Sequence, residues 1–225
     1  MNKIVLFSGG LDSTVLLYDV VKRNGAENVI ALSMFYGQKH AKEQEYADAT
    51  CKELDVQLIN LDMSTIFQFN TNSSALLTGS TQKIEHKSYA EQLAEKPGTV
   101  SAYVPFRNGL FLSAAASVAL QFEANEIYYG AHADDAAGNA YPDCTLEFIK
   151  FMQLAIDFGS GKQTTLIAPF AKWNKAQIVA LGKTLEVDFN KTWSCYEGKR
   201  KPCGTCGTCI DRKAALEANG ITNID

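Results

Sequence analysis

The chain has 225 residues and a formal net charge of −4, with 46% hydrophobic and 20% charged residues. This length accommodates one large α/β domain, or one domain with a small appendage, and this composition is globular rather than disordered. Because the charge is mildly negative, we expect no nucleic-acid partner bound through its phosphates. The chain has no signal-peptide pattern and no apolar run of about 18 residues, so we expect a cytoplasmic protein with no membrane partner.

Short apolar runs alternate with helical patterns in the first part of the chain. The runs at residues 4–7, 29–35 and 56–61 are separated by helical patterns over residues 14–23 and 41–54. This alternation predicts an α/β fold with a doubly wound, mostly parallel sheet and right-handed crossovers. The remaining strands of a five-stranded sheet are expected at residues 126–129 and 164–168. Before them we expect an apolar helix over residues 111–120 that begins at residues 107–108.

Capping residues predict where the later helices begin. Asp143 precedes an apolar helical pattern at residues 146–158, and Asn174 precedes another that runs to residue 185. Both are residue types whose side chains accept hydrogen bonds from a first helical turn. A last short helix is expected over residues 211–218.

Residues 62–104 interrupt the alternation of strands and helices. Asn, Ser and Thr are frequent at residues 70–81, and residues 83–97 are polar. The length of this excursion and its position after the third strand predict that it covers a substrate, and a plain surface loop is the alternative. We divide the chain into an α/β domain over residues 1–190, which includes this excursion, and a C-terminal segment over residues 191–225.

The strongest local signal is the sequence Ser-Gly-Gly-Leu-Asp-Ser at residues 8–13, between the first strand and the first helix. Two glycines allow the backbone to turn sharply and to approach a ligand closely. The N–H groups of the loop and the start of the helix favour an anion there, and Ser8, Ser13 and Thr14 add hydroxyl groups. Asp12 beside a phosphate needs Mg²⁺ or a donor that it orients. The alternative is an ordinary turn capped by Asp12 or Ser13.

Four of the six cysteines lie within fifteen residues near the C-terminus, namely Cys195, Cys203, Cys206 and Cys209. Four thiolates suit a tetrahedral Zn²⁺ and leave no open position, so we expect the metal to hold the C-terminal segment in place. An iron–sulfur cluster is one alternative, because Cys-x2-Cys-x2-Cys also occurs in ferredoxins, and free or redox-active thiols are another. Cys51 and Cys144 are expected to be packing residues, with a catalytic role for Cys144 as the alternative.

The loop at residues 8–13 resembles the PP-loop of the adenine nucleotide α-hydrolase-like superfamily. The resemblance implies that the loop binds the pyrophosphate of ATP and that ATP is cleaved between its α- and β-phosphates. It also implies an ATP site with Mg²⁺ as part of the co-substrate. That site is composed of Phe7, Ser8, Gly9, Gly10, Leu11, Asp12, Ser13, Thr14, Val15, Leu16 and Leu17.

Further motifs, between about residue 3 and about residue 220, resemble the 7-cyano-7-deazaguanine synthase family within that superfamily. They are Tyr36-Gly37-Gln38-Lys39-His40, Val104-Pro105-Phe106-Arg107-Asn108, Tyr141-Pro142-Asp143-Cys144 and Trp193-Ser194-Cys195-Tyr196, followed by the cysteine cluster. The resemblance implies an ATP-dependent ligase of queuosine biosynthesis. Such an enzyme adenylates 7-carboxy-7-deazaguanine, forms the amide with ammonia, and activates the amide again to give the nitrile 7-cyano-7-deazaguanine (preQ0).

The resemblance also implies site residues and partners. Asp12, Ser13 and Arg107 are expected to be catalytic, and the substrate is expected to contact Lys39, His40, Arg107, Asn108, Tyr141 and Asp143. The alternatives without a role in the site are a solvated loop at Lys39 and His40, a surface position for Arg107 and a helix cap for Asp143. No glutamine amidotransferase domain fits into 225 residues, so free ammonium is the expected nitrogen source, and a homodimer is the expected assembly.

The sequence departs from the family's usual pattern in two places. Lys39 stands where arginine is more usual, and residues 131–140 differ from the usual acidic stretch, so no role is assigned to Asp134 or Asp135. Two other functions remain as alternatives. One is a tRNA-thiolating PP-loop enzyme, against which the negative charge argues, and the other is a non-catalytic nucleotide-binding module held together by zinc.

Overall fold

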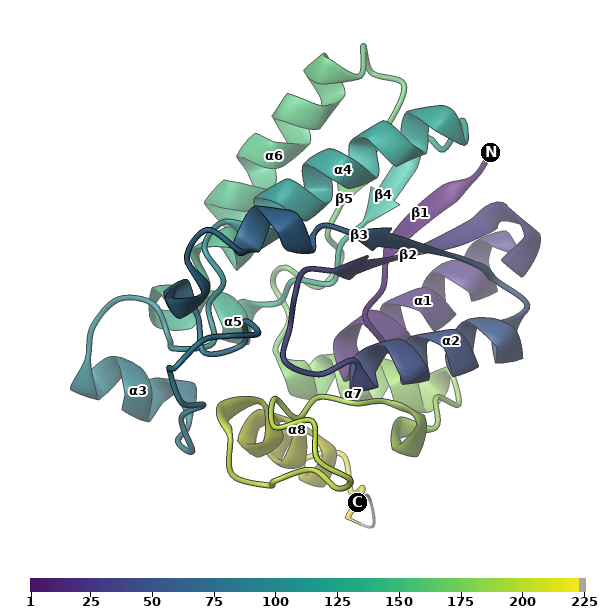
Figure 1. Ribbon diagram of the computed structural model, residues 1–225. Coiled ribbons are helices and arrows are strands. Elements are labelled where there is room, and N and C mark those ends of the chain that lie inside the picture. Colours follow the sequence, from purple (N-terminus) through teal and green to yellow (C-terminus); the bar gives the residue numbers. More distant parts are fainter. Residues whose placement is uncertain (223–225) are drawn as a thin grey trace.

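The computed structural model describes residues 1–222 and contains one five-stranded sheet (Figure 1). Its strand order is β3-β2-β1-β4-β5, and every neighbouring pair is parallel. The strands are β1 (Lys3–Leu6), β2 (Val29–Phe35), β3 (Gln57–Asp62), β4 (Glu126–Tyr128) and β5 (Thr165–Ile167). The doubly wound parallel sheet predicted from the sequence is therefore confirmed, and each predicted strand agrees with these bounds to within one residue at either end.

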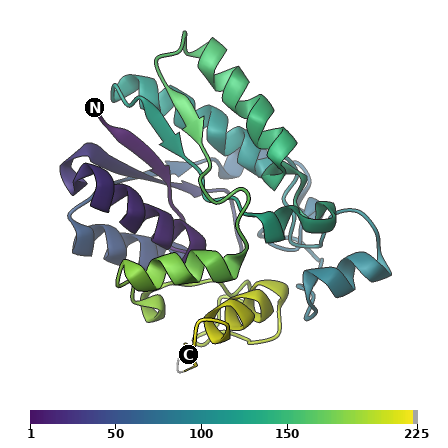
Figure 2. The ribbon, with the colours of Figure 1, turned by 180° about the vertical axis from the view of Figure 1, so that it is seen from behind.

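Helices cover both faces of the sheet, as Figures 1 and 2 show. One face carries α1 (Leu11–Asn24), α2 (Lys42–Leu54) and α7 (Lys175–Thr184), and the other carries α4 (Arg107–Gln121) and α6 (Leu146–Gly159). Successive side chains of a strand point to opposite faces. Ile4 of β1 is accordingly buried with the core of α4 and α6, and Val5 with the core of α1 and α7. A strand buried on both faces reads as an uninterrupted apolar run.

The strand order reverses at β1. From β1 the chain moves outward through β2 and β3, and it then returns to place β4 on the other side of β1. At such a switch point the loops at the carboxyl ends of the two central strands diverge and leave a crevice for ligands. The loop at residues 7–10, which follows β1, and Gly130, which follows β4, lie at this point.

One predicted helix cap and two predicted helix starts are wrong. Helix α1 begins at Leu11, three residues before the predicted pattern. Helix α6 begins at residue 146 as predicted, but Asp143 does not cap it. The N-cap of α6 is Thr145, whose Oγ1 accepts a hydrogen bond from the N–H of Phe148 at 3.2 Å. The carboxylate of Asp143 instead accepts the N–H of Asn108 at the start of α4, at 3.0 Å. The last helix, α8 (Gly207–Glu217), begins four residues before the predicted position, because Cys206 is its N-cap.

The start of α7 agrees with the prediction. Asn174 Oδ1 accepts the N–H of Gln177, and Gln177 Oε1 accepts the N–H of Asn174, both at 2.9 Å. This capping box satisfies donors at the start of the helix. Asp134 accepts the N–H of Lys175 at 2.7 Å. These contacts fix the position of Lys175, which faces the loop after β1.

The excursion after β3 is packed onto the body of the protein. It contains α3 (Tyr89–Glu95), and its residues Leu77, Val100 and Val104 are buried in the same core as α4. A single antiparallel bridge joins Leu77 to Gln38, in the segment after β2. The prediction that this excursion covers a bound substrate stays a prediction. Within residues 1–222, the structure contains no helix with the length and apolar character needed to cross a bilayer.

Candidate active site

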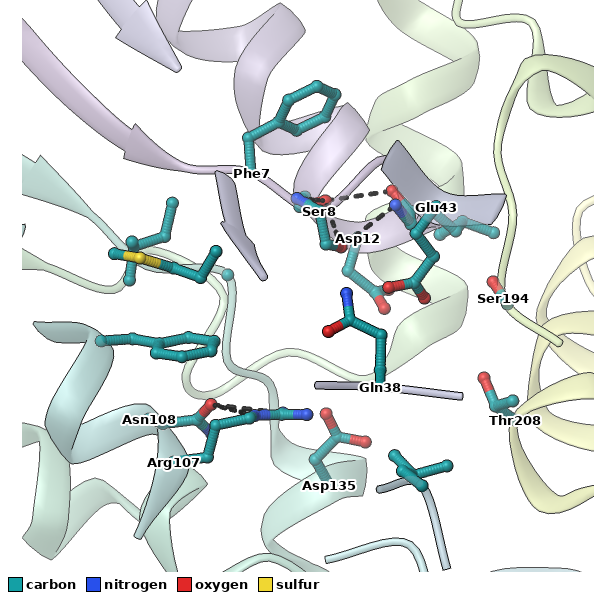
Figure 3. Close-up of a pocket in the computed structure, with 18 of the residues that line it drawn as sticks. Phe7, Ser8, Asp12, Gln38, Glu43, Arg107, Asn108, Asp135, Ser194 and Thr208 are labelled. Carbon is teal, nitrogen blue, oxygen red and sulfur yellow. Dashed lines mark hydrogen bonds between the residues drawn. The ribbon is translucent and has the colours of Figure 1, made fainter. Parts of the chain in front are cut away.

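A cavity lies at the carboxyl ends of β1, β2 and β4 (Figure 3). It is lined by six segments that are distant in the sequence. They are the loop after β1, the segment after β2, the start of α4, residues 129–131 after β4, Lys175 of α7, and Trp193, Ser194 and Tyr196 of the C-terminal segment. Leu76, Tyr89 and Ala102 of the excursion line it too, as do Asp135, Tyr141 and Cys144 before α6 and Thr208 of α8. The motifs that the sequence analysis singled out therefore converge on one place.

The loop after β1 needs glycine because α2 packs directly on it. Gly9 has a φ of +85°, and a Cβ at this position would lie 2.3 Å from the carbonyl oxygen of Glu43 and 2.8 Å from the N–H nitrogen of Ala47. Any side chain would force α2 away from the loop. The close packing of α2 therefore requires glycine at position 9. The next residue, Gly10, is the N-cap of α1.

No side chain caps the first turn of α1 within the described part of the chain. Gly10 is the N-cap, so the alternative of an ordinary turn capped by Asp12 or Ser13 is wrong. Ser13 Oγ instead donates to the carbonyl oxygen of Gly10 at 3.2 Å and lies 3.2 Å from Ser8 Oγ. The first N–H groups of a helix that lacks a side-chain cap can bind an anion, and these two hydroxyl groups stand beside them.

Asp12 is half-buried and belongs to a chain of charges that includes the buried residues His132 and Lys175. Its Oδ2 lies 3.2 Å from Nζ of Lys175 and 3.5 Å from Nε2 of His132, and His132 lies 3.4 Å from Oδ2 of Asp135. Burial opposes ionisation of Asp12, but Lys175 and then His132 outweigh it and hold the pKa of Asp12 well below its usual range. Burial likewise disfavours the charged forms of Lys175 and His132, but the carboxylates raise both pKa values.

The second carboxylate oxygen of Asp12 fits a ligand. Oδ1 is buried and accepts no hydrogen bond from residues 1–222. Carboxylate oxygens are the ligands that Mg²⁺ prefers in proteins, so this oxygen could hold the ion that accompanies ATP, while Oδ2 is held by Lys175. Lys175, His132 and Asp135 were not predicted from the sequence, and the one local signal was the cap residue before Lys175.

Arg107 lies at the start of α4 and on the cavity wall. Its guanidinium lies 5.0 Å from the ring centre of Tyr36 and 5.7 Å from that of Phe111, and it donates to Tyr36 Oη and Asn108 Oδ1, both at 3.3 Å. Such packing holds a planar donor in one orientation. The alternative of an unattached surface arginine is therefore wrong, and its contact with a phosphate or a carboxylate stays a prediction.

The other predicted residues divide into two groups. Lys39, His40, Asn108 and Tyr141 line the cavity, as do Phe7, Ser8, Gly10, Leu11, Asp12 and Ser13. Gly9, Thr14, Val15, Leu16, Leu17 and Asp143 do not line it. Because Asp143 accepts the N–H of Asn108, it orients the start of α4, and its predicted contact with a purine edge stays a prediction.

Cys144 is buried at the edge of the cavity. Its Sγ lies 3.4 Å from Tyr129 Oη and 3.5 Å from Asn108 Nδ2. Burial, reinforced by the charge of Asp135, raises the pKa of this thiol well above its usual range. A thiol that stays protonated is a poor nucleophile, and this supports the packing role over the catalytic one.

Three tyrosines connect the excursion, the loop before α6 and the C-terminal segment. Tyr196 Oη lies 2.8 Å from Tyr89 Oη and 3.0 Å from Tyr141 Oη, and Tyr141 Oη lies 3.2 Å from Tyr89 Oη. All three side chains line the cavity. Tyr196 directly follows Cys195, so the cysteine cluster is linked to the cavity wall through one residue.

The four clustered cysteines form a site that could hold a metal ion. The ligand atoms of Cys195, Cys203, Cys206 and Cys209 all lie within 4.8 Å of one another. The N–H of Cys203 points to Cys195 Sγ at 3.2 Å, and the N–H of Cys206 points to Cys203 Sγ at 3.3 Å. Such N–H groups offset negative charge on sulfur, so the donor set and its surroundings fit a thiolate-bound ion. None of the four lines the cavity.

The parallel sheet, its strand order and the Gly-Gly loop at its switch point give an α/β fold of the PP-loop ATPase-like kind. The solved structure of U34-tRNA thiolase NcsA from Methanococcus maripaludis with its [4Fe-4S] cluster is similar, with a TM-score of 0.51 and 16% identity. The match covers 97% of this chain and 66% of that chain, so our chain spans just under two thirds of its length. This likeness concerns the fold.

Residues 2–220 match the family described as queuosine biosynthesis protein QueC, and the chain belongs to this family. It is 40% identical to a 7-cyano-7-deazaguanine synthase from Archaeoglobus fulgidus, over 98% of this chain and 88% of the relative. It is 38% identical to one from Caldicellulosiruptor saccharolyticus, over 98% and 93%. A synthase from Alteromonas mediterranea is 37% identical, over 99% and 96%.

The ion pair of Asp12 and Lys175 leads to a testable pH dependence. In the variant Lys175→Met, Asp12 loses its nearest cation, and we expect the free energy of unfolding at neutral pH to fall by about 3 kcal/mol. Because folding lowers the pKa of Asp12 from 3.8, its contribution is complete above that value and is lost as the pH falls through the lower folded pKa. Because folding raises the pKa of Lys175 from 10.5, its contribution is complete below that value and is lost as the pH rises through the higher folded pKa.

The measurement is urea unfolding followed by circular dichroism, from acidic to neutral pH. The difference between the wild type and Lys175→Met should be constant near neutral pH and shrink below about pH 4. Lys172→Met, at an exposed position nearby, is the matched control and should stay within about 0.5 kcal/mol of the wild type. Equal stability of Lys175→Met and the wild type at neutral pH would contradict the role given to this pair.

Proposed function

We propose that this protein is an ATP-dependent synthase that converts 7-carboxy-7-deazaguanine and ammonium into 7-cyano-7-deazaguanine for queuosine biosynthesis. The observation that carries the proposal is the match, over nearly the whole chain, to relatives named 7-cyano-7-deazaguanine synthase. The geometry supports it, because an anion-binding loop and a fixed guanidinium line the same cavity. This substrate is a free base, so the function requires no contact with a nucleic acid.

The first step is activation of a carboxylate. A carboxylate resists attack because oxide is a poor leaving group, and transfer of AMP to the acid replaces it with a good one. The N–H groups at the start of α1 and the hydroxyl groups of Ser8 and Ser13 are placed to hold the departing pyrophosphate. Mg²⁺, when bound, neutralises phosphate charge, and Asp12 is the residue placed to hold it. Arg107 is placed to orient the acid or a phosphate.

The second step reuses the same site. Ammonia displaces AMP to give the amide, and a second adenylation of the amide oxygen is followed by loss of AMP and formation of the nitrile. No covalent bond to the protein is needed, in agreement with the protonated state of Cys144. Asp12 and the loop therefore serve two rounds of ATP cleavage in one cavity.

The test is incubation of the purified protein with ATP, Mg²⁺, ammonium and 7-carboxy-7-deazaguanine, read by mass spectrometry. We expect the nitrile to form together with AMP. Asp12→Ala should lower the rate of AMP release by at least about 100-fold, since it removes a charge at the site of phosphate transfer. Asp48→Ala, an exposed acid on α2, should leave the rate unchanged. The absence of the nitrile with folded wild-type protein would refute the proposed function.

We also propose that the cysteine cluster holds one structural Zn²⁺ per chain. Four thiolates complete a tetrahedral shell, and an ion there would fix Tyr196 at the cavity wall without entering the chemistry. A [4Fe-4S] cluster, such as the one in the solved thiolase from Methanococcus maripaludis, is the competing occupant. Reduced thiols of this kind also support our proposal of a cytoplasmic location.

Metal analysis of the variant Cys206→Ser tests this site. We expect about one zinc per wild-type chain, and little metal together with a lower melting temperature in the variant, because structural zinc contributes directly to folding. Cys51→Ala, in α2 and outside the cluster, should keep the metal. If the wild type contained iron and absorbed near 400 nm, the occupant would be an iron–sulfur cluster and not zinc. Full zinc occupancy of Cys206→Ser would contradict the ligand set.

The expected homodimer has a candidate surface on α6. The exposed fractions of Phe151, Leu154 and Phe158 are 66%, 42% and 72%, and their spacing puts them on one face of the helix. In a two-fold dimer the same surface of both copies forms the interface, so one apolar helix face per chain is enough. We propose that α6 pairs with α6 of a second copy.

Light scattering coupled to size-exclusion chromatography measures the assembly. We expect twice the chain mass of 24.6 kDa for the wild type and a monomer for Phe151→Glu/Phe158→Glu, because the paired copies would bring four carboxylates into an apolar contact. Lys52→Glu, on α2 at the opposite face of the sheet, should remain a dimer. A monomeric wild type, or a double variant that still dimerises, would contradict the proposal.

A further inference from the structure

Glu43 is a carboxylate on the cavity wall that the sequence analysis did not single out. It lies in the first turn of α2, where its carbonyl oxygen packs against Gly9. Figure 3 shows its side chain extending into the cavity, in the region of Asp12 and Gln38. It thus stands next to the loop at which pyrophosphate would bind. A carboxylate in that place would repel a phosphate unless a cation or a proton accompanied it.

The charged groups of the cavity otherwise have partners. Asp12 is paired with Lys175 and His132, and Asp135 is paired with His132. Glu43 is the cavity carboxylate with no hydrogen bond or ion pair from its side chain to residues 1–222. Glu43 is half-buried, and a carboxylate partly withdrawn from water without such a partner favours a cationic ligand.

The chemistry of the neighbours restricts that ligand. Arg107 is close enough to Glu43 to influence its protonation. Mg²⁺ requires nearly octahedral oxygen coordination, which one carboxylate does not supply. A small monovalent cation that donates hydrogen bonds suits one carboxylate better, and ammonium is the reactant of the proposed function with these properties.

We propose that the carboxylate of Glu43 binds ammonium in this cavity and takes a proton from it, which releases ammonia for attack on the adenylated acid. This inference rests on the proposed function. Ammonium is not a nucleophile, because its nitrogen has no free electron pair. Transfer of one proton to Glu43 frees that pair, and the nitrogen then forms a bond to the acyl carbon. The C–O bond to AMP breaks, AMP leaves with the electron pair, and a second proton is lost to water as the neutral amide forms.

The ionisation of Glu43 agrees with this role. Burial raises its pKa to about 7, although Arg107 opposes the shift. A base whose pKa lies near the working pH is ionised often enough to bind a cation and basic enough to accept a proton. The other titratable groups that line the cavity are Asp12, Tyr36, Lys39, His40, Tyr89, Arg107, Tyr129, Asp135, Tyr141, Cys144, Lys175 and Tyr196.

The test separates adenylation from the use of ammonia. Exchange of labelled pyrophosphate into ATP in the presence of the acid, without ammonium, reports adenylation alone. In Glu43→Gln we expect this exchange to stay within about two-fold of the wild type, and kcat/KM for ammonium in amide formation to fall by about 100-fold. Hydroxylamine is largely unprotonated at neutral pH and needs no base, so it should restore acyl transfer in Glu43→Gln, with the hydroxamate as product.

Glu45→Gln is the matched control, because Glu45 is exposed and lies two residues away on the same helix, and both of its rates should equal those of the wild type. Loss of pyrophosphate exchange in Glu43→Gln would overturn the inference and assign Glu43 to the metal or phosphate instead. An unchanged kcat/KM for ammonium would also overturn it. Wild-type protein that shows neither exchange nor nitrile would instead refute the proposed function, so the two failures are distinguishable.

Discussion

The buried ion pair between Asp12 and Lys175 holds together the parts of the protein that come from opposite ends of the chain. Asp12 lies in the first turn of α1, and Lys175 in the first turn of α7. His132 lies beside Asp12 and connects the pair to the loop after β4. A lone charge at this depth would be strongly destabilising, so folding brings the two helices and this loop together at the switch point of the sheet. The cavity opens at this junction.

A second constraint acts on the other side of the cavity. Because Gly9 has no side chain, α2 approaches the loop closely enough to bring Glu43 to the cavity wall. Because the N-cap residue of α1 is Gly10, the start of this helix has no side-chain cap within residues 1–222. Anion-binding N–H groups, an ionised aspartate and an unpaired glutamate are therefore held within one small space. This combination suits a reaction that handles phosphate and an amine in succession.

The C-terminal segment contributes to the site more than its distance in the sequence suggests. Trp193 and Tyr196 line the cavity, and the cysteines between and after them form the candidate metal site. Tyr196 meets Tyr89 of the excursion and Tyr141 of the loop before α6. A metal that orders this segment would thus also order the cavity wall, although its ligands do not face the cavity.

The sequence by itself determined the strands, the parallel sheet and the motifs that surround the site. This was possible because a strand buried on both faces leaves an uninterrupted apolar run, and a Gly-Gly turn before a helix leaves a local pattern. Asn174 was recognised as a cap for the same reason, since its partner Gln177 is three residues away. The spacing of the four cysteines was similarly local.

Only the tertiary structure decided which charges meet. His132 and Glu43 carry no local signal of their positions in the cavity, and the cap before Lys175 predicts a helix start but not its ion pair, because these residues lie on elements that come together only at the switch point of the sheet. The same reason explains the misplaced cap. A sequence shows that Asp143 precedes a helix. It does not show that the backbone N–H of Asn108, 35 residues earlier, donates to the Asp143 carboxylate. Local order is encoded in neighbouring residues, whereas the ionisation and pairing of buried groups are set by the folded chain around them.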